Sequence, residues 1–343
     1  MYLDYINLST ENQKALIEAA ALQMKVNPII IEKDLWVVFV LQVLFDRIHD
    51  YNIHKALTFK GGTSLSKAYQ IIERFSEDID ITIDRKFLGL QISDETLKNY
   101  SRNKRDQIFE ELEKRGHQFI EKHILPYLKF KLSSLAPKEK IDVKFSNEDV
   151  LSLEIYYPNC FQSTYSSYIQ PRIYVEFGVR GDSYPTESKN IRPYLHEKIR
   201  QINDLCVPVN VLLPLRTFFE KVTLLHAEVH RPESEKTPLR LSRHFYDLHQ
   251  LIEKGGLIEP ANRVDLLKNV IDHKSLFFAS KKASYETIYE NGLKLLPSQQ
   301  RLGDIERDYN EMQAMFFGAS PKFEEILKSI NHIQTSLNEI LLS

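Results

Sequence analysis

The chain has 343 residues, of which 43% are hydrophobic and 27% are charged, and its formal net charge is −2. This composition is ordinary for a folded globular protein and excludes a broadly basic nucleic-acid coat, so any contact with nucleic acid must be local. Its two cysteines, Cys160 and Cys206, form neither a CxxC pair nor a metal-ligand spacing, which argues against a disulfide scaffold and against a structural zinc site.

The N-terminal residues are polar and acidic, unlike a signal peptide. The most apolar early stretch, residues 35–45, is too short to span a bilayer and is flanked by Asp34 and Asp46. Together with the cysteine usage, these features predict a cytoplasmic protein without a membrane partner.

Helices are expected first. Ser9 and Thr10, followed by Glu11, form a cap pattern ahead of a helical run to residue 24, and residues 29–48 continue as a second helix. A short strand over 56–60 is broken by Gly61 and Gly62, and apolar residues then recur at helical steps over 63–74. Residues 78–84 alternate between isoleucine and acidic or hydroxyl residues, which predicts a strand.

Residues 93–132 form a charged amphipathic helical stretch, and strand-like runs follow at 141–146, 151–157 and 172–179. A polar loop over 180–193 and a linker over 207–214 are expected next, and the remainder is helical in pattern. We therefore predict an α+β domain with a mixed sheet over residues 1–206, followed by an all-helical domain over 207–343.

Asp78 and Asp80 project from the same face of their strand, and two carboxylates so close oppose each other's ionisation unless a cation neutralises them. Mg²⁺ suits this pair, because it is commonly held by one or two carboxylates together with substrate phosphates. The glycine turn ahead of a helix offers free backbone N–H groups to those phosphates. The combination predicts an enzyme acting on a nucleotide, provided that residues 78 and 80 lie beside the 61–64 turn.

Simpler interpretations exist for each part. A glycine pair alone is commonly just a turn, and an isolated D-x-D is commonly a solvated strand face. The segment GGTSLSK lacks the Walker A spacing, and Ser64–Lys67 matches S-x-x-K without the S-D-N or K-T-G motifs that accompany it. The ordered combination favours the functional interpretation.

The segment FKGGTSLSKAYQIIERFSEDIDITI (59–83) resembles the core of the AbiEii/AbiGii nucleotidyltransferase toxin family, within the DNA polymerase β-like superfamily. Further similar segments are IIEKDLWVVFVL (30–41), RIYVEFGVRGDSYPTE (172–187), RTFFEKVTLLHAE (216–228) and RLSRHFYDLHQL (240–251). The resemblance covers nearly the whole chain. It implies a polymerase-β-like fold and transfer of a nucleoside monophosphate from an NTP with release of pyrophosphate. Some members are toxins that modify the tRNA acceptor end under control of a cognate antitoxin, here a separate chain.

The resemblance also implies roles for individual residues. Triphosphate contacts are expected from Gly61, Gly62, Thr63 and Ser64. Lys67 could reach the same phosphates or be an ordinary surface lysine, and Ser76 could contact the γ-phosphate, orient Asp78 or simply belong to a turn. Arg74 could neutralise phosphate charge or pair with Glu77.

Asp78 and Asp80 are the expected metal ligands, with Glu176 as the favoured third carboxylate and Glu154 as its competitor. Glu176 could complete a second metal site or take the acceptor proton. Lys221, in an apolar helix, is expected to offset charge on the leaving pyrophosphate, although it could also reach from the helix flank into water.

Asp247 is expected to orient Lys221 or to act near the acceptor, and Arg240 and Arg243 form a small basic helix face suited to RNA phosphate. Two alternatives to RNA modification stay open. One is transfer to a protein or small-molecule hydroxyl, and the other is a catalytically silent module that binds nucleotide or RNA.

Overall fold

The computed structural model describes residues 5–46, 52–135, 141–161, 170–197, 205–255 and 264–343. The chain divides into two compact units, the first formed by residues 1–68, 75–92 and 100–212 and the second by residues 69–74, 93–99 and 213–343. The sequence-based domain boundary after residue 206 stays a prediction. Within the part of the chain that the structure describes, no helix is long and apolar enough to cross a membrane.

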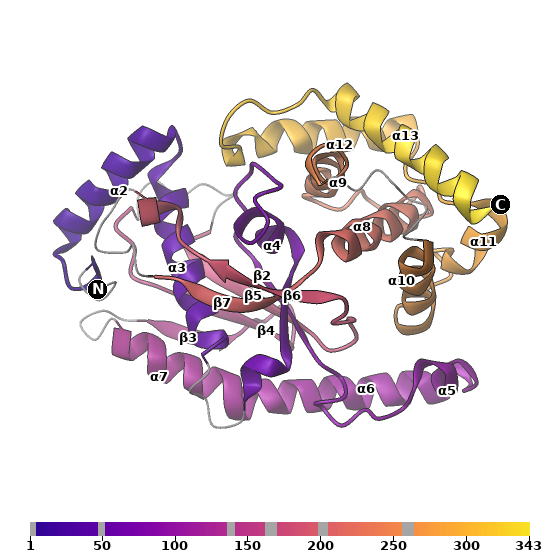
Figure 1. Ribbon diagram of the computed structural model, residues 1–343, viewed down its shortest axis with the longest axis horizontal. Coiled ribbons are helices and arrows are strands. Elements are labelled where there is room, and N and C mark those ends of the chain that lie inside the picture. The colour runs from indigo at the N-terminus through magenta and orange to yellow at the C-terminus, as the bar shows by residue number, and fades with distance from the viewer. Residues whose placement is uncertain (1–4, 47–51, 136–140, 162–169, 198–204, 256–263) are drawn as a thin grey trace. The chain divides into compact units, whose positions relative to one another are not determined.

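A seven-stranded sheet forms the centre of the first unit, with the strand order β3-β4-β5-β2-β1-β7-β6 (Figure 1). The strands are β1 (Leu57–Lys60), β2 (Ile79–Ile83), β3 (Asp142–Phe145), β4 (Ser152–Tyr156), β5 (Arg172–Gly178), β6 (Thr186–Ile191) and β7 (Val207–Leu212). The β1–β7 and β2–β5 pairs are parallel and the other pairs are antiparallel. The predicted mixed sheet and α+β class are therefore confirmed.

The two faces of the sheet differ in polarity. In β2, Ile79, Ile81 and Ile83 are fully buried, while Asp80 and Thr82 alternate with them. Successive side chains of a strand point to opposite faces, and residues paired across neighbouring strands point to the same one. The register therefore gives the sheet one apolar face and one face that carries polar and acidic side chains.

The helices of the first unit are α2 (Thr10–Met24), α3 (Pro28–Leu44), α4 (Gly61–Lys67), α6 (Arg102–Phe119) and α7 (Leu125–Leu135), with a π-helical turn η2 (Ile120–Ile124) between the last two. The expected cap of α2 is present, since the Ser9 hydroxyl accepts a hydrogen bond from the Asn12 N–H at 3.3 Å. Helix α3 is buried almost all round and packs against β5, β7 and α7. A helix with so wide an apolar surface is suited to the centre of a domain.

Three sequence-based expectations for the first 214 residues were wrong. The helix expected over 63–74 ends at Lys67, and Gln70 has a left-handed φ of +54°, which an α-helix cannot continue through. The expected linker over 207–214 contains β7, whose Val207, Val209 and Val211 are buried in the sheet. The expected loop over 180–193 contains β6, a polar edge strand paired only with β7 in the described part of the sheet.

The second unit is largely helical, as predicted. Its helices are α5 (Asp94–Lys98), α8 (Pro214–Val229), α9 (Ser242–Lys254), α10 (Val264–Phe277), α11 (Ile288–Asn291), α12 (Gln299–Glu311) and α13 (Phe323–Leu341). Helix α9 packs against α8, α12 and α13. Segment 69–74 joins this unit because Glu73 donates its N–H to the Tyr246 hydroxyl and Arg74 forms a backbone bridge with Phe316.

Candidate active site

The glycine turn and the aspartate pair meet in the first unit. Helix α4 begins at Gly61, directly after β1, and Gly61 has a φ of +77°, a conformation that favours glycine. A Cβ atom at Gly61 would lie 1.8 Å from Oδ2 of Asp80, so only a residue without a side chain fits here. The expected juxtaposition of turn and carboxylate is therefore present.

The two hydroxyl residues of the turn are fully buried. Thr63 donates its hydroxyl to the carbonyl of Asp78, and Ser64 donates to the carbonyl of Gly61 at 2.8 Å. Both hydroxyl protons thus hold the turn in place and fasten it to the segment ahead of β2. A role for Thr63 and Ser64 as phosphate contacts stays a prediction, as do the backbone contacts expected from Gly61 and Gly62.

Asp80 lies at the centre of a row of three in-register residues on neighbouring strands. It is paired with Lys60 of β1 on one side and with Glu176 of β5 on the other. Adjacent strands are about 4.8 Å apart, and paired residues point to the same face. Asp78 comes one residue before β2 and two before Asp80, and the two aspartates are half-buried whereas Glu176 is exposed.

The competitor Glu154 is placed differently. It lies on β4, opposite Tyr174, and so is one strand further from Asp80 than Glu176 is. Glu154 is buried, forms an ion pair with Arg172, and accepts a hydrogen bond from the Tyr156 hydroxyl at 2.8 Å. This geometry favours Glu176 as the third carboxylate.

The donor chemistry of this row fits Mg²⁺, because carboxylate oxygens are its preferred protein ligands. Among the described residues, no group of three or more His, Cys, Asp and Glu side chains is gathered as a metal site. Asp78, Asp80 and Glu176 are therefore not gathered into such a group, and their role as metal ligands stays a prediction. Mg²⁺ is commonly held by one or two carboxylates together with substrate phosphates and water.

Lys67 forms a buried ion pair inside the first unit. Its side chain is buried, its ammonium is 2.5 Å from Oδ1 of Asp34, and it lies 3.6 Å from the centre of the Tyr194 ring. Burial lowers the pKa of Lys67 and raises that of Asp34, and in each case the partner's charge opposes the shift. The surface-lysine alternative is therefore wrong, whereas the expected phosphate contact stays a prediction.

Ser76 is half-buried in the segment between Arg74 and β2. Its role, whether toward the γ-phosphate or toward Asp78, stays a prediction. Its neighbour Glu77 is buried and forms an ion pair with Lys33 of α3. Arg74 is paired with Asp247, so the alternative pairing of Arg74 with Glu77 stays a prediction.

A second cluster of charged residues lies within the second unit. The carboxylate of Asp247 on α9 accepts two hydrogen bonds from Arg74, each 2.8 Å long, and forms an ion pair with Lys221 of α8 at 2.9 Å. The Nδ1 atom of His244 lies 3.3 Å from the Lys221 ammonium. The side chain of Lys221 is only 8% exposed, so it does not reach out into water as the alternative supposed.

The charges in this cluster offset one another. Burial alone would raise the pKa of Asp247, but the charges and hydrogen bonds of Arg74 and Lys221 outweigh it and hold the pKa well below its usual range. Burial, followed by the charges of Lys221 and Arg243, lowers the pKa of His244 well below its usual value. A neutral His244 can accept a hydrogen bond from the Lys221 ammonium.

The two arginines proposed for RNA do not share a helix. Arg240 precedes α9 and has a left-handed φ of +59°, while Arg243 lies in the first turn of α9. The expected continuous helix face is therefore wrong, although both side chains are half-buried rather than enclosed. Their role toward RNA stays a prediction.

Sequence reasoning missed two features of the site region. One is the position of Lys60 beside Asp80, which its place directly before the glycine pair could have indicated. The other is the set of buried partners on α3, where Glu32, Lys33 and Asp34 are three consecutive charges inside an apolar helix. Consecutive charges in such a helix are a signal, because buried charges need partners.

Comparison with known proteins gives a family match. The model of the AbiEii family, described as nucleotidyl transferase AbiEii toxin of a type IV TA system, matches residues 42–329. A search of curated proteins found no match. Among solved structures, the chain is similar to MenT4, a nucleotidyltransferase toxin from Mycobacterium tuberculosis H37Rv, with 16% identity over 98% of this chain and 100% of that one and a TM-score of 0.46. At this level the structural likeness supports no statement about function.

Proposed function

Since this chain belongs to the AbiEii nucleotidyltransferase toxin family, we propose that it transfers a nucleoside monophosphate from an NTP to RNA, with tRNA 3′ ends as the expected acceptor. Family membership makes it a nucleotidyltransferase and the toxin of a type IV toxin–antitoxin system, which implies an NTP substrate and a cognate antitoxin. The acceptor, the need for Mg²⁺, the separate antitoxin chain and a cytoplasmic location belong to the proposal.

The observation that carries the proposal is the in-register row of Asp80 and Glu176 beside the glycine turn. Two acidic side chains on neighbouring strands repel each other. Lys60, on the other side of Asp80 in the row, brings one positive charge to this place. Because Gly61 has no side chain, its backbone lies against the Asp80 carboxylate, and the N–H groups of the turn come close to the acidic row. An NTP with its divalent cation would supply positive charge to the carboxylates and phosphate oxygens to those N–H groups.

The proposed reaction forms one bond and breaks one. The oxygen of an acceptor hydroxyl attacks the α-phosphorus of the NTP, the bond from that phosphorus to the bridging oxygen of the β-phosphate breaks, and pyrophosphate leaves. Backbone N–H groups at residues 61–64 hold the triphosphate, and Glu176 receives the hydroxyl proton. Lys221, oriented by Asp247, has the sequence-based role of offsetting charge on pyrophosphate.

Asp78, Asp80 and Glu176 are the residues proposed to hold Mg²⁺. When bound, the ion would add positive charge at the phosphates and make the acceptor hydroxyl easier to deprotonate. The three side chains supply oxygens only, so softer metals that prefer sulfur or imidazole are disfavoured.

The test is incubation of the purified chain with each of the four radiolabelled NTPs, total RNA and Mg²⁺, followed by separation of RNA and protein on gels. Label in a band of tRNA size supports the proposal. Label on protein instead would replace RNA by a protein acceptor, the runner-up hypothesis. Absence of transfer to any acceptor, together with unchanged toxicity of Asp80→Asn in cells, would overturn the catalytic proposal and favour the silent binding module.

A further inference from the structure

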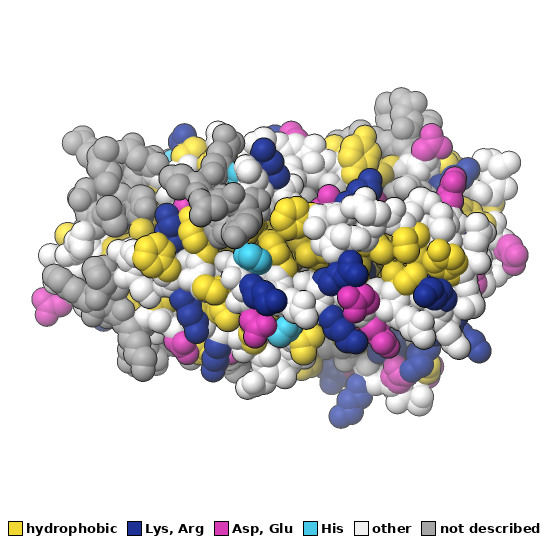
Figure 2. Space-filling model, turned by 90° about the horizontal axis from the view of Figure 1, so that it is seen from below, with side chains coloured by type: hydrophobic (Ala, Val, Ile, Leu, Met, Phe, Trp, Pro, Cys, Tyr) yellow, Lys and Arg dark blue, Asp and Glu magenta, His cyan; other side chains and the backbone are white. Residues whose placement is uncertain are grey.

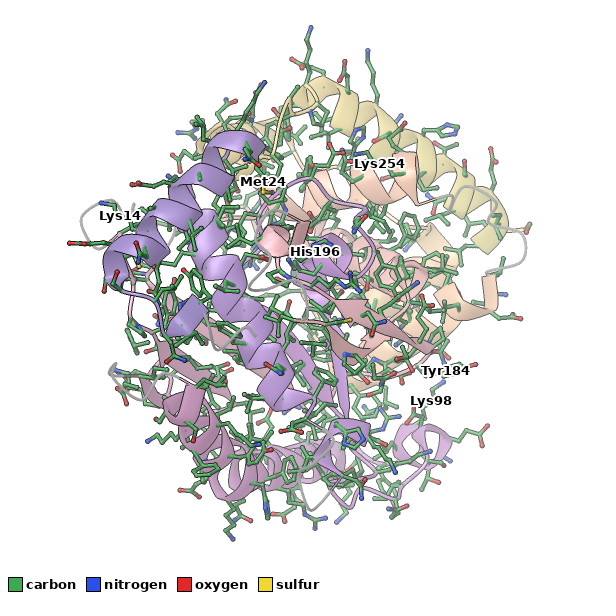
Figure 3. The ribbon with its side chains drawn as sticks, turned by 60° about the vertical axis from the view of Figure 1, so that its left-hand side comes forward. Lys14, Met24, Lys98, Tyr184, His196 and Lys254 are labelled. Carbon is green, nitrogen blue, oxygen red and sulfur yellow. The ribbon has the colours of Figure 1, made fainter. Side chains whose placement is uncertain are left out.

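Three consecutive charged residues near the start of α3 each bind a different segment of the first unit. Glu32, Lys33 and Asp34 are all 2% exposed. Successive side chains on a helix point about 100° apart, so the three side chains point in three different directions. In Figure 3 the label His196 marks η3 (Tyr194–Glu197), a short segment that packs against α3 and receives one of these contacts.

Lys33 contacts the approaches to both strands that carry the active-site carboxylates. Its ammonium forms an ion pair with Glu77, which directly precedes Asp78. The same ammonium donates to the carbonyl of Gln170 at 2.7 Å, two residues before β5, the strand that carries Glu176. One side chain therefore joins the leading ends of β2 and β5, which run parallel and side by side.

Asp34 contacts the helix that follows the glycine turn. Its Oδ1 is paired with the ammonium of Lys67, the last residue of α4, and its Oδ2 accepts from the N–H of Tyr194 at 2.6 Å. Helix α4 has only seven residues and begins with the turn at Gly61. A short helix fastened at its last residue cannot rotate freely, so the ion pair fixes the direction in which the turn presents its N–H groups.

Stability alone does not account for these buried charges. Replacing a buried ion pair by apolar residues of similar size is often neutral or stabilising, whereas removing one partner is strongly destabilising. Lys33 and Asp34 each combine an ion pair with a hydrogen bond to the backbone, and two such contacts fix the relative positions of the segments that they join. Groups that hold metal ligands in place commonly matter for metal affinity and activity although they touch neither metal nor substrate.

We propose that Lys33 and Asp34 are positioning residues with divided roles, Lys33 setting the carboxylates of β2 and β5 and Asp34 setting the glycine turn. This inference rests on the proposed nucleotidyltransferase function, and its tests use ligand binding as well as transfer. The chain offers an internal control in Glu32, which is equally buried and accepts from the N–H of Cys160 at 2.6 Å, after the end of β4. Cys160 adjoins none of the proposed site residues.

The variants remove both partners of a pair, so that no lone charge stays buried. Lys33→Met with Glu77→Leu should leave the thermal unfolding temperature unchanged or higher, but weaken Mn²⁺ binding, measured by electron paramagnetic resonance, about 10- to 100-fold and lower kcat by a similar factor. Asp34→Asn with Lys67→Met should raise the Kd of a nonhydrolysable ATP analogue, measured by calorimetry, about tenfold or more while Mn²⁺ binding stays within about twofold of wild type.

Glu32→Gln should change neither ligand affinity by more than about twofold. If both double variants fold and bind Mn²⁺ and nucleotide as the wild type does, the inference is wrong and the charges are merely structural. If both variants lose both ligands equally, the division of roles is wrong. A wild-type chain that binds both ligands but labels no RNA would refute only the proposed acceptor, and a wild-type chain that binds neither would overturn both proposals.

Discussion

At the scale of single residues, Asp80 is the side chain on which the proposed chemistry depends most. Asp80→Asn keeps the shape of the side chain and removes its charge. We expect transfer to fall by about 10³-fold or more, since a metal-bound transition state is stabilised by several kcal/mol. Asp84→Asn is the matched control, because Asp84 lies just after β2 and caps the N–H of Lys86 at 2.9 Å. Equal activities of the two variants in the labelled-NTP assay would contradict the assignment.

Gly61→Ala tests the turn itself. The added methyl group would collide with the Asp80 carboxylate and would also require alanine at a φ of +77°. We expect a loss of about 1–3 kcal/mol in the free energy of unfolding, together with a marked loss of transfer. Gly303→Ala provides the control, because nothing lies within 4 Å of its added Cβ and it sits in α12. There alanine should stabilise by about 0.5–1 kcal/mol. Urea denaturation of both variants measures the contrast.

The sequence could locate the glycine turn and the aspartates because their pattern is local, spanning residues 61–80. The partners of Lys67 and Arg74 could not be predicted from the sequence, because these pairings are not local. Asp34 is 33 positions from Lys67, and Asp247 is 173 positions from Arg74, and no periodicity encodes such pairings. The sequence already favoured Glu176 over Glu154, but it could not show that Glu176 is in register with Asp80, because a single sequence does not specify the strand register.

At the scale of elements, Asp247 joins α8, α9 and segment 69–74 through its contacts with Lys221 and Arg74. Asp247→Asn leaves two buried cations with weakened compensation, so we expect about 3–5 kcal/mol of destabilisation. The exposed pair of Lys98 and Asp272, 2.8 Å apart in the same unit, is the control. Asp272→Asn should cost at most about 1 kcal/mol. The midpoints of urea denaturation of the two variants measure this difference. Similar midpoint shifts for both variants would show that the contacts of Asp247 contribute no more to stability than an exposed ion pair does.

A buried histidine makes the second unit sensitive to acid. His226 of α8 lies near the Ser284 carbonyl, 3.2 Å from its Nε2, and its Nδ1 accepts from the Lys294 N–H at 3.0 Å. Nδ1 cannot accept once it is protonated. Burial lowers the pKa of His226 to about 4, because the charged imidazolium is less well solvated inside the protein than in water.

Between pH 6.5 and about pH 4, His226 is therefore protonated in the unfolded chain but neutral in the folded chain. The contribution of neutral His226 to the free energy of unfolding is present in full above pH 6.5. It falls by about 1.4 kcal/mol per pH unit as the pH is lowered toward 4. His226→Gln cannot titrate, so its free energy of unfolding should fall less steeply over this range. Parallel pH profiles of the two proteins would show that His226 titrates normally in the folded chain.

The order of elements was predictable where the local signal was strong, as in the cap of α2, the long apolar run of α3 and the alternation in β2 and β5. It was not predictable for β6, whose sequence TESKNI lacks apolar alternation because it forms an edge strand. The early end of α4 was also hidden. Residues 69–74 keep a helical pattern of apolar residues, but their backbone bonds with Tyr246, Phe316 and Phe317 in the second unit replace helical ones.

At the scale of the whole molecule, the near-neutral charge limits how nucleic acid can be bound. The net charge is −2, and on the face seen in Figure 2 basic side chains are interspersed with acidic and apolar ones. Long-range attraction of RNA should therefore be weak, and recognition must come from a few contacts. This separates the chain from proteins whose binding is dominated by a basic surface.

The dependence of RNA binding on salt measures the number of such contacts. With about three phosphates contacted, the slope of log K against log salt concentration should be only about −2 to −3, since each contact contributes about −0.7 to −0.9. Arg243→Ala should weaken binding and make the slope shallower by about one unit if Arg243 contacts a phosphate. Arg307→Ala is the control, because Arg307 is 78% exposed and pairs with Asp304 three residues earlier on α12. Filter binding of labelled tRNA from 50 to 200 mM salt gives both slopes. A steep wild-type slope that neither substitution changes would mean that RNA is held by a basic surface elsewhere on the molecule, and would remove Arg243 from the proposed acceptor site.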